Sequence, residues 1–139
     1  MSYLLDTSVI SELRKGKRAD ASVKAWFEGL EDGEIHLSVL TIGEIRRGIE
    51  NVRRRDPDSA IALDSWLARL GEVHRDRILP IDRAIAEEWG RMNVPDPLPV
   101  IDGLLAATAK VSGLTFATRN IADVEGTGVE LVDPFASAS

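Results

Sequence analysis

Hydrophobic residues in this chain alternate between short continuous runs and segments in which they recur every three or four residues. The runs predict strands, and the longer spacing is typical of amphipathic helices. We expect four to five strands, at residues 3–5, 35–38, 77–81, 114–117 and 129–132. We expect helices between them, beginning near residues 7, 21, 39, 57, 83 and 101.

Strands separated by helices predict an α/β fold, because a parallel strand connection needs a dozen or more residues, usually in a helix. We therefore expect a three-layer α/β/α domain with a mostly parallel central sheet. No repeat, low-complexity tract or linker divides residues 1–139, so one domain is expected. The residues after Phe135 are expected to be loosely held.

Composition and charge narrow the range of functions. The chain has no cysteine, which excludes disulfides and thiol chemistry, and it has neither a signal-like N-terminus nor an apolar run long enough to span a bilayer. We expect a cytoplasmic protein with no membrane contact. The net charge of −6 argues against a protein that coats nucleic acid with a basic surface.

Four carboxylates stand at places where a ligand site is expected. In parallel sheets, ligands bind beyond the carboxyl ends of the strands. Asp6 follows the first strand and Asp123 follows the strand that ends near residue 117. Taken alone, Asp6 is also a good helix N-cap, and Asp123 lies in a segment typical of turns.

Glu44 and Asp102 each have two interpretations as well. Residues 41–44 match the Thr-x-x-Glu capping box, but Ser38 is an equally good cap, and a helix that begins there would place Glu44 in its interior. Asp102 is either a first-turn acid favoured by the helix dipole or a carboxylate on a helix that is apolar nearly all round. Convergence of the four acids would require a counter-charge, and Mg²⁺ or Mn²⁺ prefers such oxygen ligands.

The four segments that carry these acids resemble those of PIN-domain ribonucleases, and specifically VapC-type toxins of bacterial type II toxin-antitoxin pairs. The matching segments are Leu4-Leu-Asp-Thr-Ser, Ser38-Val-Leu-Thr-Ile-Gly-Glu44, Ile101-Asp-Gly-Leu-Leu and Thr118-Arg-Asn-Ile-Ala-Asp123. The resemblance implies a metal-dependent endoribonuclease that hydrolyses RNA phosphodiester bonds with Mg²⁺ or Mn²⁺. It assigns catalysis and metal binding to Asp6, Glu44, Asp102 and Asp123, and supporting roles to Thr7, Ser8, Thr118 and Asn120.

The same resemblance implies partners. A cognate VapB-type antitoxin would inhibit the nuclease and contact operator DNA on its behalf, and the toxin would form a homodimer. Surfaces around Trp66 and Trp89 are candidates for that interface as well as for the core.

Basic, aromatic and histidine side chains allow further interpretations. RNA contacts are candidates at Arg14, Arg46, Arg47 and Arg119, although a solvated helix edge explains such residues equally well. Trp26 and Phe27 have the spacing of core residues. His36 and His74 are too few for a histidine zinc site, and a strand or loop position is expected for each.

Two other functions share parts of this pattern, and the sequence argues against the first. A phosphatase that uses an aspartate after the first strand needs a second aspartate two residues later, and Ser8 occupies that position. The alternative to an enzyme is a non-catalytic PIN-like subunit that serves as the partner of a DNA-binding regulator.

Overall fold

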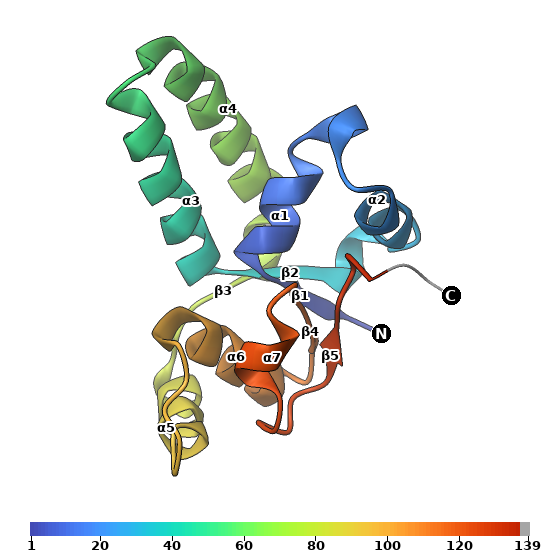
Figure 1. The fold of residues 1–139 in the computed structure, drawn as a ribbon, viewed down its shortest axis with the longest axis vertical. Coiled ribbons are helices and arrows are strands. Elements are labelled where there is room, and N and C mark those ends of the chain that lie inside the picture. The colour runs from blue at the N-terminus through green and yellow to red at the C-terminus, as the bar shows by residue number, and fades with distance from the viewer. Residues whose placement is uncertain (137–139) are drawn as a thin grey trace.

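A five-stranded sheet forms the centre of the protein, whose computed structural model describes residues 1–136 (Figure 1). All neighbouring strands are parallel, and their order is β3-β2-β1-β4-β5. Their bounds are β1 Tyr3–Leu5, β2 Ile35–Ser38, β3 Ile78–Leu79, β4 Thr115–Ala117 and β5 Leu131–Val132.

Helices cover both faces of this sheet (Figure 1). Four lie on one face: α1 Thr7–Leu13, α2 Ala21–Glu28, α3 Val39–Arg53 and α4 Pro57–Val73. Three lie on the other: α5 Arg83–Met92, α6 Val100–Ser112 and α7 Ile121–Val124. The predicted three-layer α/β/α architecture is confirmed. Helices α3 and α4 pack against each other as a hairpin (Figure 1).

Alternation along the strands divides the core into two parts, because successive side chains of a strand point to opposite faces. Leu5 and Ala117 pack with α1 to α4, whereas Leu4 and Phe116 pack with α6 and α7. All four are fully buried. Trp26 and Phe27 pack against the first part, as their spacing predicts.

Local signals in the sequence account for most helix ends. The carboxylates of Asp20, Asp56 and Asp82 accept backbone N–H groups at the starts of α2, α4 and α5, which satisfies donors that the helix leaves free. Gly113 ends α6 with a φ of 68°, a left-handed conformation that glycine adopts without strain.

The edges of the sheet differ from the expectation. Strand β3 has two residues rather than five, because Arg77 belongs to a short 3₁₀ turn and Pro80 has no N–H to donate to a neighbouring strand. Strand β5 begins at Leu131, two residues later than expected. The predicted loose tail after Phe135 falls largely on residues 137–139, which lie outside the described part of the chain. Within residues 1–136, no helix combines the length and the apolar character needed to cross a membrane.

Candidate active site

Asp6 directly follows β1 and caps α1, so its N-cap role is confirmed. The residue is only 4% exposed. One carboxylate oxygen accepts the backbone N–H of Thr7 at 2.7 Å. The other accepts the hydroxyl of Ser8 at 2.9 Å and that of Thr118 at 2.8 Å. Three donors thus fix the orientation of a buried acid without neutralising its charge.

Thr118 reaches Asp6 because β4, which ends at Ala117, is paired directly with β1. Thr118 is fully buried, and its hydroxyl also accepts the backbone N–H of Asn120 at 3.0 Å. Asn120 thus contacts Thr118 through its main chain, and its side chain makes no capping hydrogen bond to α7.

Glu44 lies inside α3, because the helix begins after Ser38, whose hydroxyl accepts the N–H of Leu40 at 3.0 Å. The capping-box interpretation of Glu44 is therefore wrong. Its carboxylate instead accepts the hydroxyl of Thr7 at 2.5 Å. Thr7 thus connects the acid of α3 to the start of α1, next to Asp6.

Asp102 and Asp123 come from the opposite layer. Asp102 is half-buried in the first turn of α6. Asp123 is exposed on α7, a one-turn helix where the sequence predicted only a turn. That difference arises because a one-turn helix is too short to show a periodic pattern.

The negative charges of the other three acids act on Asp102. Burial, followed by the negative charges of Asp6, Asp123 and Glu44 and by hydrogen bonding with Asp123, raises the pKa of Asp102 from 3.8 to about 6. No Lys or Arg forms an ion pair with any of the four carboxylates in residues 1–136. The site therefore concentrates negative charge without a protein counter-charge.

This charge pattern fits a hard divalent cation, since all four candidate ligands offer oxygen. Within the same residues, no three acidic or histidine side chains already stand as a complete ligand set. The two observations agree, because charges act on one another well beyond the ~2 Å length of a metal–oxygen bond. The acids would have to move closer together for one cation to bind them all.

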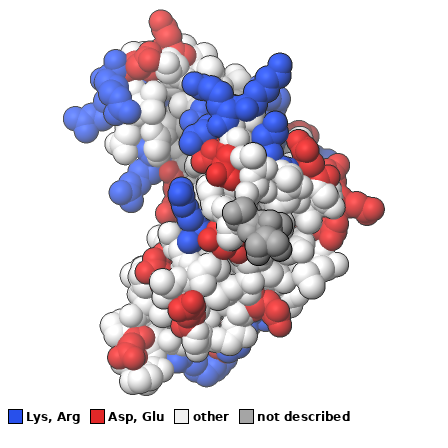
Figure 2. All heavy atoms as spheres, turned by 45° about the vertical axis from the view of Figure 1, so that its right-hand side comes forward, with Lys and Arg blue, Asp and Glu red and all other residues white. Residues whose placement is uncertain are grey.

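The four candidate arginines differ in availability. Arg46 binds Asp64 at 2.7 Å and Glu50 at 3.3 Å on the outside of the α3–α4 hairpin. Arg119 lies 4.5 Å from the ring centroid of Phe135, and Arg14 lies 5.9 Å from that of Trp66. Arg47 is exposed on α3. Figure 2 shows basic side chains gathered mainly in its upper half, with acidic ones both above and below them.

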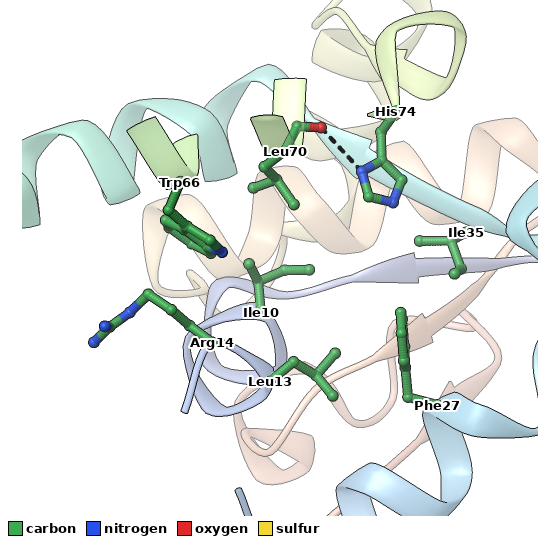
Figure 3. Close-up of a pocket in the computed structure, with 8 residues that line it drawn as sticks. All are labelled: Ile10, Leu13, Arg14, Phe27, Ile35, Trp66, Leu70 and His74. Atoms are coloured by element: carbon green, nitrogen blue, oxygen red, sulfur yellow. Dashed lines mark hydrogen bonds between the residues drawn. The ribbon is translucent and has the colours of Figure 1, made fainter. Parts of the chain in front are cut away.

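Neither histidine belongs to the site. His36 lies in β2, and His74 follows α4, where its Nδ1 lies 3.0 Å from the carbonyl oxygen of Leu70 (Figure 3). Trp89, one candidate for a dimer interface, packs close to Gly103 of α6.

The sequence profile of the PIN domain matches residues 3–122. The chain belongs to the PIN-domain family. The resemblance that the four acidic segments indicated is thereby confirmed.

Two solved structures and one sequence relative illustrate where this PIN domain lies in the family. It is 30% identical to the VapC ribonuclease Y4jK of Sinorhizobium fredii, over 97% of this chain and 99% of that protein. The structure of FitAcB from Neisseria gonorrhoeae superposes with a TM-score of 0.88 at 29% identity, covering 96% of this chain and 98% of that one. A toxin-antitoxin complex from Klebsiella pneumoniae gives 0.66 at 25% identity, covering 96% and 98%.

Sequence reasoning missed the surroundings of the acids on the α3 side. Gly48 lies one helical turn after Glu44, and Trp66 of α4 lines the same hollow as both. The spacing of four residues between an acid and a glycine in a helix was a usable signal, because such residues share a face. No such signal predicts that Trp66 lies beside these residues, since Trp66 comes from a different helix.

Proposed function

We propose that this PIN domain is a Mg²⁺- or Mn²⁺-dependent endoribonuclease toxin that hydrolyses RNA phosphodiester bonds. The observation that carries the proposal is the contact geometry of two acids from different elements: Ser8 and Thr118 donate to Asp6, and Thr7 donates to Glu44. The raised pKa of Asp102 supports it, because the charges of Asp6, Asp123 and Glu44 contribute to that shift. The name of the Sinorhizobium relative, a VapC ribonuclease, supports the same activity.

Asp6, Glu44 and Asp102 would hold the principal ion, and Asp123 would complete the set from α7. When bound, the cation lowers the pKa of a coordinated water and offsets the negative charge that develops on the phosphate. The hydroxyls of Ser8 and Thr118 keep the Asp6 carboxylate aimed at the site, and the hydroxyl of Thr7 does the same for Glu44. These hydrogen bonds connect the β1–α1 segment to the end of β4 and to α3.

Regulation by a partner is part of the proposal. A VapB-type antitoxin would cover the acids, and an arginine of that partner would supply the missing positive charge. Operator DNA would be contacted through the antitoxin alone, and the toxin would pair with a second copy of itself. The similar structure from Klebsiella pneumoniae is a toxin-antitoxin complex, which supports an assembly of this kind.

The test is RNA cleavage by purified protein that is free of any partner. We expect cleavage with Mg²⁺ or Mn²⁺, none in EDTA, and products with 5′-phosphate and 3′-hydroxyl ends. Asp6→Asn and Asp102→Asn should abolish cleavage while circular dichroism shows a folded protein. Cleavage that persists in EDTA would refute the metal mechanism.

The alternative, a non-catalytic partner of a DNA-binding regulator, gives a different result. It predicts no growth arrest when the intact, folded protein is expressed alone, and no RNA cleavage at any metal concentration. Growth arrest that Asp6→Asn relieves would exclude it.

A further inference from the structure

An apolar hollow of about 200 Å³ opens beside the proposed metal site. It lies between α1 and the α3–α4 hairpin, and Thr7 and Glu44 form the edge next to the acids. Leu63 and Trp66 of α4 form part of the opposite wall. The hollow thus borders the proposed metal site at Glu44.

Gly48 leaves this hollow open on the α3 side. It lies in the interior of a helix of 15 residues, where glycine is less favourable than alanine. Its φ is not positive. A Cβ added there would meet no atom within 4 Å. Neither backbone conformation nor packing requires glycine at this position. The effect of the missing side chain is to leave space in the hollow on the α3 side.

Basic side chains border the far side of the same hollow. Arg14 lines it, lies over the ring of Trp66, and joins Lys15 and Arg18 around an adjoining open depression. Figure 3 draws a neighbouring pocket that shares these two residues, and it shows Arg14 beside Trp66 with the guanidinium pointing away from that neighbouring pocket. Within residues 1–136, Lys15 pairs with Glu12, whereas Arg14 and Arg18 form no ion pair.

The order of these surfaces, from acids to apolar hollow to basic rim, matches the chemistry of a single RNA strand. A phosphate at the metal site is followed along the strand by a base with an apolar face, and then by another phosphate. Unpaired bases are recognised by stacking on aromatic side chains, and phosphates by arginine.

We propose that this hollow is a nucleobase subsite, in which an unpaired base next to the scissile phosphate packs against Trp66 while Arg14 holds the neighbouring phosphate. The inference rests on the proposed ribonuclease activity and adds to it a determinant of substrate choice. Trp66 acts as the stacking surface, and Gly48 provides the room for the base.

Binding of short single-stranded RNA to the inactive Asp102→Asn protein tests the subsite without cleavage. An abasic unit is moved along the strand one position at a time, in the presence of Mg²⁺, with fluorescence anisotropy as the readout. We expect one position at which loss of the base weakens binding about tenfold, the size of one stacking contact. Adding Gly48→Leu should weaken binding of the intact RNA similarly and remove the sensitivity at that position.

Matched variants separate the subsite from effects on folding. Gly90→Leu in α5 is the control, because Gly90 is also an exposed helix glycine with no atom within 4 Å of an added Cβ. It should bind as the parent does. Trp66→Phe should keep the abasic sensitivity, whereas Trp66→Leu should lose it.

The outcomes distinguish the subsite from the activity. Abasic sensitivity with no cleavage by the wild-type protein would support the subsite and refute the ribonuclease function. Full RNA binding by the Gly48→Leu protein would overturn the subsite, as would equal loss at every abasic position. If Gly48→Leu weakened binding only of a protein partner, the hollow would belong to that partner instead.

Discussion

Replacing Asp102 with asparagine should stabilise the metal-free protein even though it abolishes cleavage. The folded state penalises the charged form of this carboxyl, because burial and the charges of Asp6, Asp123 and Glu44 raise its pKa from 3.8 to about 6. An asparagine of nearly the same shape removes the charge and with it the penalty. The free energy of unfolding of the metal-free Asp102→Asn protein should therefore be higher than that of the wild type.

The size of the gain follows from the pKa. A shift from 3.8 to about 6 corresponds to a ceiling of about 3 kcal/mol in the free energy of unfolding. Asp102 is only half-buried, so solvent screens the repulsion and we expect about 1 kcal/mol. For a chain of this length, that gain raises Tm by about 3 °C.

The pH dependence gives the prediction its sign. Because the folded-state pKa is raised, the contribution of Asp102 to stability is fully present below pH 3.8 and is lost as the pH rises through about 6. The difference in Tm between Asp102→Asn and wild type should therefore be small near about pH 4 and reach its full size above about pH 6. Differential scanning calorimetry in EDTA measures both.

Two controls complete the experiment. Asp96→Asn, at an exposed carboxylate in the loop before α6, should leave Tm unchanged at every pH. Mg²⁺ should raise the Tm of wild type more than that of Asp102→Asn, because a ligand stabilises only the state that binds it. A variant that melts below wild type at neutral pH in EDTA would refute the electrostatic reasoning.

Other substitutions test the contacts that hold the site. Thr118→Val removes a buried hydroxyl that donates to a carboxylate, and urea unfolding should show a loss of about 1–3 kcal/mol that Thr118→Ser restores. Ser38→Ala should cost about 1 kcal/mol as a lost N-cap. Thr41→Val should cost nothing in the same assay, because the buried hydroxyl has no partner in residues 1–136; a comparable loss at both positions would contradict the assigned helix start. Gly48→Ala should gain about 0.5–1 kcal/mol. Gly103→Ala should lose stability, since its Cβ would lie 3.2 Å from the Cβ of Leu98, and a gain there would show that α6 can move away.

Parts of this protein follow from local sequence alone. Periodicity places the helices, and short polar side chains such as Asp56 and Asp82 mark where they begin, because a cap acts on the next two or three backbone N–H groups. Alternating strands and helices then leave few topologies, since parallel crossovers are right-handed. One domain and a homodimer remain predictions from the sequence.

The candidate site was only partly predictable. The positions of the four acids relative to strands and helices marked them as candidates. The sequence did not decide between a helix cap, a turn residue and a metal ligand for each acid. Glu44 had two interpretations that differ by the choice between Ser38 and Thr41 as a cap, and both satisfy the same local rule. The structure decides for Ser38, which leaves Thr41 buried and frees Glu44 to accept the hydroxyl of Thr7.

The sequence by itself determined the order of the elements, the alternation of core residues along β1 and β4, and the identities of the acids. Only the tertiary structure decided which of these distant groups meet. Thr118 reaches Asp6 across 112 positions because β4 pairs with β1, and Trp66 faces Gly48 because α4 folds back on α3. Caps and periodicity act within a few residues, whereas the field around Asp102 and the hollow beside Glu44 depend on contacts between segments that no local pattern encodes.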